Sequence, residues 1–133
     1  MSAEFTPKQV RHLFFDREEQ RCFFCRRLLS FALRGSVLAG GWSLHHRKGR
    51  GMGGTRERMT CAHGLILCGT GTTGCHGWVT EHPKEAFEYG LCVPKNATTA
   101  EYQPQNVRVR DRAGSWFLLT ENGRAVEVEG PNR

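Results

Sequence analysis

Four cysteines in two pairs are the residues of this chain best suited to holding a metal ion. Two of them stand three positions apart near the N-terminus, and the other two stand seven positions apart near the middle of the chain. Four thiolates can close a tetrahedral zinc site, which contributes folding energy to a short chain. We therefore predict one structural zinc ion. Its ligands would be Cys22, Cys25, Cys68 and Cys75.

Three histidines close to these cysteines could supply a second kind of chemistry. His45 and His46 are adjacent, and His76 directly follows Cys75. Four thiolates would satisfy the zinc, so the imidazoles remain available as a general base and as ligands of a second, catalytic ion. Neighbouring residues on a regular strand point to opposite faces. His45 and His46 can therefore share a site only if the strand ends or is distorted there.

A basic cluster lies beside the histidine pair. The chain has 19 Lys and Arg against 13 Asp and Glu, a formal net charge of +6. Such a cluster next to candidate catalytic groups suits a polyanionic substrate, above all nucleic acid, although a solubilising surface would have the same composition. The candidate DNA-binding residues are Arg47, Lys48, Arg50, Arg56 and Arg58.

The sequence favours a reducing, cytoplasmic setting without a membrane anchor. Its first residues are polar and lack the apolar core of a signal peptide. Its longest apolar stretches fall short of the roughly 20 residues that span a bilayer. Paired cysteines in a reducing compartment bind metal more often than each other. Cys61 and Cys92 lie outside the two pairs and are expected to be small buried residues.

The elements that must position these residues can be read from the apolar pattern. Thr6 is a good N-cap before Pro7, so a helix is expected from there to about residue 19. Strands are expected over residues 42–47 and 65–68, and residues 28–39 should form a strand or an irregular hairpin arm. A helix should run from residue 75 to about 89, with a break near Pro83.

The last part of the chain has a different pattern. Three strand-like runs, at residues 107–110, 116–120 and 125–129, are separated by turn signals, of which Asn122-Gly123 is the stronger. Residues 93–106 are polar and contain proline. We predict a metal-binding domain over residues 1–92, a linker over 93–106 and a small antiparallel β-meander over 107–130.

Taken together, the cysteine pairs, Leu44-His45-His46 and His63 five residues before Cys68 resemble the HNH endonuclease family, over roughly residues 20–90. The segments LHHRKGRGMGGT and LCGTGTTGCHGWV are most similar to small HNH proteins of tailed bacteriophages. The resemblance implies an α+β fold, a zinc-stabilised ββα-metal finger of two antiparallel strands and a helix. It also implies a divalent-metal-dependent hydrolase that cuts double-stranded DNA with little sequence specificity.

The resemblance assigns roles to the histidines. His46 would be the general base, His45 and His76 would bind the catalytic ion, and His63 would brace the loop that carries the base. Many relatives have a further histidine where this chain has Thr80. With only two protein ligands, the ion would be Mg2+ or Mn2+ rather than tightly bound zinc. His12 and His82 are expected to have ordinary structural roles.

The phage resemblance implies DNA processing beside packaging (terminase) proteins, in the host cytoplasm. Two departures, His63 in place of asparagine and Thr80 in place of histidine, favour a rival. In that rival the chain is a non-catalytic, zinc-stabilised module that binds DNA or a packaging protein. A homing or restriction-type nuclease is a third alternative, with only the C-terminal segment available to read DNA.

Overall fold

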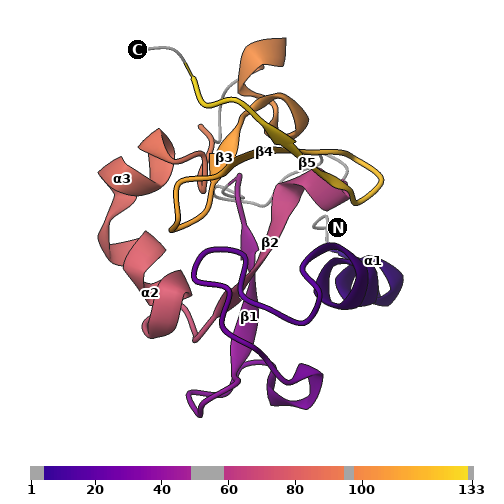
Figure 1. Ribbon diagram of the computed structural model, residues 1–133, viewed down its shortest axis with the longest axis vertical. Coiled ribbons are helices and arrows are strands. Elements are labelled where there is room, and N and C mark those ends of the chain that lie inside the picture. The colour runs from indigo at the N-terminus through magenta and orange to yellow at the C-terminus, as the bar shows by residue number, and fades with distance from the viewer. Residues whose placement is uncertain (1–4, 49–58, 95–97, 132–133) are drawn as a thin grey trace.

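The structure, a computed structural model, describes residues 5–48, 59–94 and 98–131. It is a mixed α+β fold in which a central hairpin has helices on both sides and a small sheet across one end (Figure 1). The hairpin strands are β1 (Trp42–His46) and β2 (Gly64–Cys68). None of the helices in the described ranges is long and apolar enough to cross a bilayer.

The N-terminal helix begins where the sequence predicts. Thr6 caps α1 (Pro7–Arg11) through a capping box with Gln9, and the chain continues as a π-helix over His12–Arg17. The buried residues of this segment, Val10, Leu13 and Phe14, pack on the hairpin, where the rings of Phe14 and Trp42 are 4.7 Å apart. The expected helix is therefore present, but its second half is wound more loosely than an α-helix.

The hairpin is antiparallel, with His45 opposite Leu65 and His46 opposite Gly64. Strand β2 is buried along its whole length because both of its faces are covered. On β1 the side chains alternate. Trp42 contacts the N-terminal helical segment, whereas His45 contacts His76 on the other side of the sheet.

Two short helices follow β2. Helix α2 (Gly74–Glu81) ends at His82, and α3 (Pro83–Glu88) starts immediately with the proline at its first position. The expected break near Pro83 is confirmed. Residues 28–39, in contrast, contain a 3-10 turn at Phe31–Leu33 and two isolated bridges, from Leu28 to Arg21 and from Arg34 to Trp42.

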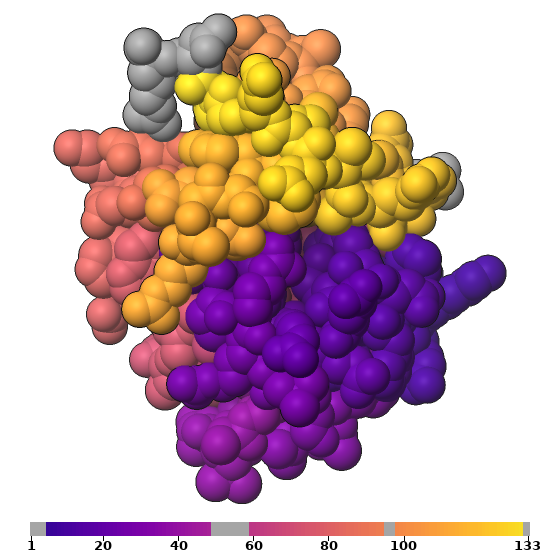
Figure 2. Space-filling view, viewed as in Figure 1, coloured from indigo at the N-terminus to yellow at the C-terminus, as the bar shows by residue number. Residues whose placement is uncertain are grey.

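The C-terminal meander is confirmed as a three-stranded antiparallel sheet of β3 (Val109–Arg110), β4 (Trp116–Leu119) and β5 (Ala125–Val128). It packs directly on the rest of the molecule (Figure 2). Val109 and Leu119 are fully buried in the same hydrophobic core as the hairpin. Two 3-10 turns, Ala100–Tyr102 and Pro104–Asn106, occupy the segment expected to be a linker. The meander therefore shares the hairpin's core instead of forming one of its own.

Candidate metal-binding and catalytic site

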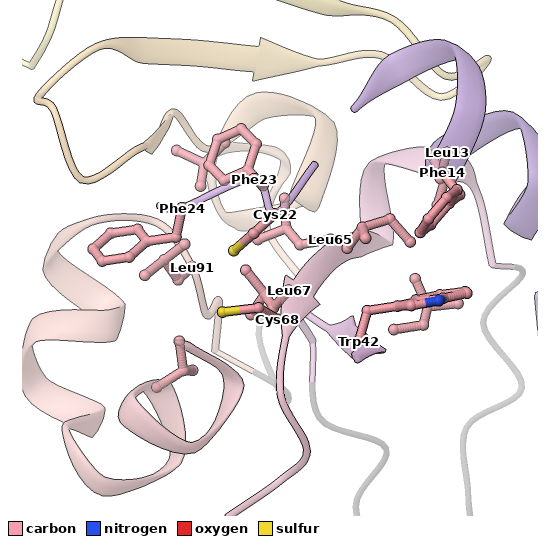
Figure 3. Close-up of a cluster of buried hydrophobic side chains, with 14 of the residues drawn as sticks. Leu13, Phe14, Cys22, Phe23, Phe24, Trp42, Leu65, Leu67, Cys68 and Leu91 are labelled. Carbon is pink, nitrogen blue, oxygen red and sulfur yellow. The ribbon is translucent and has the colours of Figure 1, made fainter. Parts of the chain in front are cut away.

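The four predicted cysteines come together and could hold a metal ion such as zinc. Their sulfur atoms all lie within 4.8 Å of one another, and the Sγ atoms of Cys25 and Cys68 are 3.8 Å apart. A tetrahedral zinc with Zn–S bonds of about 2.3 Å requires sulfur–sulfur distances of about 3.8 Å. Figure 3 shows Cys22 at the start of the cysteine knuckle, the turn from Cys22 to Cys25, and Cys68 at the end of β2. The donor set and its spacing fit zinc.

The cysteine cluster favours the thiolate form at two of its members. Hydrogen bonds from Cys22 and Cys75 hold the pKa of Cys68 well below its usual range, and a hydrogen bond from Cys22 lowers the pKa of Cys25 to about 6. The backbone N–H of Cys75 also donates to the Cys68 sulfur at 3.3 Å. A metal ion would take the place of these shared protons, because it binds thiolates and releases protons on binding.

His45 and His76 face each other between β1 and α2, with ring centroids 5.1 Å apart. The Ser43 hydroxyl donates to the Gly69 carbonyl at 2.8 Å, so its oxygen must accept the proton on His76 Nδ1, at 2.6 Å. This bond leaves the lone pair of His76 on Nε2. A second-shell bond of this kind fixes the tautomer of metal-binding histidines.

The same argument fixes His45. Its Nε2 lies 2.8 Å from the Leu91 carbonyl, which can only accept, so Nε2 carries the proton and Nδ1 carries the lone pair. Burial lowers the pKa of His45 to about 3. His45 is therefore a neutral imidazole at physiological pH, which is the form that binds metals.

His46 is the last residue of β1, and the alternation of side chains places its ring on the same strand face as Leu44, away from the face that carries His45. Its ring contacts Phe5, with centroids 5.1 Å apart. His46 also borders a hollow of about 410 Å³ that His45 and Thr80 help to line. Opposite His46 on β2 is Gly64, where an added Cβ would lie 2.8 Å from the Phe5 ring. The glycine therefore makes room for the ring that packs against His46.

His63 is the last residue of the 3-10 turn Cys61–His63, which leads into β2. Its side chain is buried, and its Nδ1 accepts a hydrogen bond from the Thr60 backbone N–H at 3.2 Å. Its carbonyl accepts from the N–H of Arg47 at 2.7 Å, which ties the turn to the end of β1. The ring nitrogen thus bonds an amide of the His63 turn itself, and it is the His63 carbonyl that links the turn to β1.

The prediction that Arg47 binds DNA is wrong, because its side chain is buried. Its side chain is only 1% exposed, and its guanidinium donates five hydrogen bonds, of 2.8 to 3.1 Å, to backbone carbonyls. The acceptors are the carbonyls of Ala62, Gly90, Pro104 and Val107. A cation so enclosed cannot reach a phosphate, so Arg47 joins separate chain segments instead.

The rest of the predicted basic cluster is described only in part. Lys48 is half-buried and forms a backbone bridge with Val93. Arg50, Arg56 and Arg58 lie outside the described residues.

Sequence analysis did not identify the two groups that hydrogen-bond to His76 and His45, which are the Ser43 hydroxyl and the Leu91 carbonyl. Ser43 lies two positions before His45 and so shares its strand face, a period-2 signal that could have been found. The Leu91 carbonyl comes from a distant loop and has no sequence signal. His82 stacks on Trp78, with centroids 4.8 Å apart, and His12 bonds the Gly123 carbonyl, so both have packing roles.

Comparisons of the chain with models of protein families, with curated proteins and with solved structures found no match.

Proposed function

We propose that this protein is a zinc-stabilised, divalent-metal-dependent endonuclease of the HNH type that hydrolyses DNA. One observation carries the proposal: His45 and His76 face each other, and each is hydrogen-bonded so that one ring nitrogen keeps its lone pair. Metal-binding histidines have this arrangement, in which the other ring nitrogen donates its proton to a nearby acceptor.

The cysteine cluster supports this proposal through its position. Cys68 ends β2, and Cys75 lies in the first turn of α2, directly before His76. Zinc at these cysteines would fix α2 against the hairpin and so fix the distance between His76 and His45. In this proposal the first metal is structural and the second acts on the substrate.

Mg2+ or Mn2+ bound at His45 and His76 would polarise a phosphate oxygen and stabilise the leaving oxygen. His46, beside the same hollow, would accept the proton of the attacking water. Thr80 stands where a third protein ligand would be expected, and its hydroxyl donates to the His76 carbonyl at 3.2 Å. Waters and phosphate oxygens would complete the coordination, as is usual for Mg2+.

Double-stranded DNA is the proposed substrate because the chain is strongly basic, with a formal net charge of +6. The resemblance to phage proteins extends the proposal to DNA processing beside packaging proteins in the host cytoplasm. Recognition by charge alone gives little sequence specificity.

The direct test is incubation of supercoiled plasmid with the protein and added Mg2+ or Mn2+, at low salt. Cleavage yields relaxed or linear DNA, and it should require the added ion even when zinc is already bound. Intact plasmid under every metal condition would refute the nuclease.

A second candidate, a non-catalytic zinc module that binds DNA or a packaging protein, is favoured by one observation. The ring of the proposed base, His46, packs against Phe5, which gives it a structural contact. Such a module would slow the plasmid in a gel without cutting it, so the same experiment separates the two candidates.

A further inference from the structure

We infer that a hollow between α2, the Cys22–Cys25 turn and the C-terminal meander binds an unpaired nucleotide, with its base on aromatic rings and its phosphate on arginines. The hollow has a volume of about 350 Å³. It is lined by Phe24, Gly74, Cys75, Trp78, Tyr89, Arg110 and Arg112. The inference relies on the proposed function only for the choice of nucleic acid as the ligand.

The aromatic side of the hollow consists of three rings in a common orientation. The plane of Trp78 is within 19° of Phe24 and within 9° of Tyr89, with centroids 5.4 and 6.2 Å apart. The planes of Phe24 and Tyr89 differ by 20°. Figure 3 shows Phe24 projecting from the cysteine knuckle toward the helices. These rings are stacked on one another, and His82 stacks on Trp78 as well, so a flat ligand would extend the stack through the parts of the rings that line the hollow. Nucleobases stack on aromatic side chains in proteins.

The charged side of the hollow is contributed by the meander. The guanidinium of Arg110 lies 4.3 Å from the Tyr89 ring centre, which extends the stacking surface with a cation. Arg112 is exposed, and its backbone N–H bonds the Phe24 carbonyl at 2.9 Å, which holds it at the rim. These two arginines can hold a phosphate beside a stacked base.

No carboxylate is among the described residues that line the hollow, so its positive charge is not neutralised from within. The nearest acid in sequence, Asp111, is buried and already occupied. Its carboxylate accepts from Arg26 at 3.1 Å and from the Ser115 N–H at 2.9 Å. A ligand that combines a flat ring with negative charge complements the hollow, and a nucleotide has both properties.

The chemistry predicts a preference for single-stranded over duplex DNA at this site, because a paired base cannot leave its stack without cost. The probe is a single-stranded oligodeoxynucleotide carrying 2-aminopurine, whose fluorescence is quenched when it stacks on an aromatic ring. Binding is measured with zinc-loaded protein and no added Mg2+ or Mn2+, so the strand is not cut.

We expect the probe to be quenched on binding. Trp78→Leu should lower affinity by roughly 10- to 100-fold, the range for loss of one stacking contact. Arg112→Ala should lower it on the order of 5-fold. Arg124→Ala, which removes the same charge from an exposed turn of the same sheet, is the matched control and should change it little.

If Trp78→Leu fails to bind zinc or to fold, Arg112→Ala still decides the question. Arg112→Ala and Arg124→Ala proteins with equal affinities would overturn the inference, as would a wild-type protein that leaves 2-aminopurine unquenched. A strand with an abasic site in place of the probe base should bind more weakly, and equal binding would also overturn it. Plasmid cleavage without quenching refutes only this inference, whereas quenching without cleavage refutes only the nuclease proposal.

Discussion

Replacing Arg47 should destabilise the whole protein, although its sequence context suggests a DNA contact. The sharpest perturbation is Arg47→Lys, which keeps the positive charge and much of the length. Arg47 donates five hydrogen bonds inside the fold, whereas lysine has three N–H groups on a single nitrogen. At least two bonds are lost, and a hydrogen bond to a charged group contributes about 1.5–3 kcal/mol. The expected loss is therefore roughly 3 kcal/mol or more.

Arg47→Ala should be more severe, because it leaves three buried carbonyls and one partly buried carbonyl without this donor and opens a cavity. Each unsatisfied buried group costs about 1–3 kcal/mol, so the total approaches the whole stability of a small domain, about 5–15 kcal/mol. We expect this variant to be largely unfolded.

The assay is urea unfolding of zinc-loaded protein followed by circular dichroism. Arg108→Lys is the matched control, because Arg108 is exposed and only two positions from strand residue Arg110. It should stay within about 0.5 kcal/mol of wild type. An Arg47→Lys protein as stable as wild type but weaker in DNA binding would refute the buried position and restore the sequence prediction.

Three further predictions follow from the site. Cys22→Ser should abolish zinc binding and folding, because structural zinc contributes on the order of 10 kcal/mol. Cys61→Ser, the control, should retain one zinc ion per chain. Native mass spectrometry measures the zinc content of both variants, and a folded, zinc-free protein would contradict the site. Because burial lowers the pKa of His45 to about 3 while an unfolded histidine titrates near ~6.5, only the unfolded state gains this proton between those values. Stability should be full above about pH 6.5 and fall by up to about 1.4 kcal/mol per pH unit below it. In the His45→Gln variant, the unfolding free energy should lose this part of its dependence on pH. Urea unfolding at each pH measures it, with zinc retention checked in every sample. An unchanged pH dependence would contradict a buried neutral His45. His46→Ala should slow plasmid cleavage by roughly 10²- to 10⁴-fold without changing DNA binding. His12→Ala, the control, should cleave at the wild-type rate. A His46→Ala protein that cleaves as fast as wild type would remove His46 from the mechanism.

Much of the scaffold follows from local signals in the sequence. The Thr6-Pro7 cap, the break at Pro83 and the three C-terminal strands each depend on a few neighbouring residues, and each is present in the structure. The cysteine cluster could also be predicted, because two cysteine pairs in a short chain have few other uses.

The parts that sequence analysis missed depend on distant segments. Arg47 reads as part of a basic surface, yet carbonyls separated by more than forty positions in sequence converge on it. The Leu91 carbonyl that orients His45 is equally remote. The polar segment before the meander resembles a linker, but one of its carbonyls, that of Pro104, completes the Arg47 site. Such three-dimensional convergence leaves no pattern in a single sequence.

The most direct test of the central claim is a Mn2+ titration of plasmid cleavage by wild type, His45→Ala and His76→Ala, all loaded with zinc. If the two histidines bind the catalytic ion, each variant should need a higher Mn2+ concentration for half-maximal rate, and excess Mn2+ should restore part of the activity. Loss of one ligand should weaken the ion without removing the base, so the shift should appear mainly in the metal dependence. Wild-type metal dependence in both variants would contradict a catalytic ion at His45 and His76.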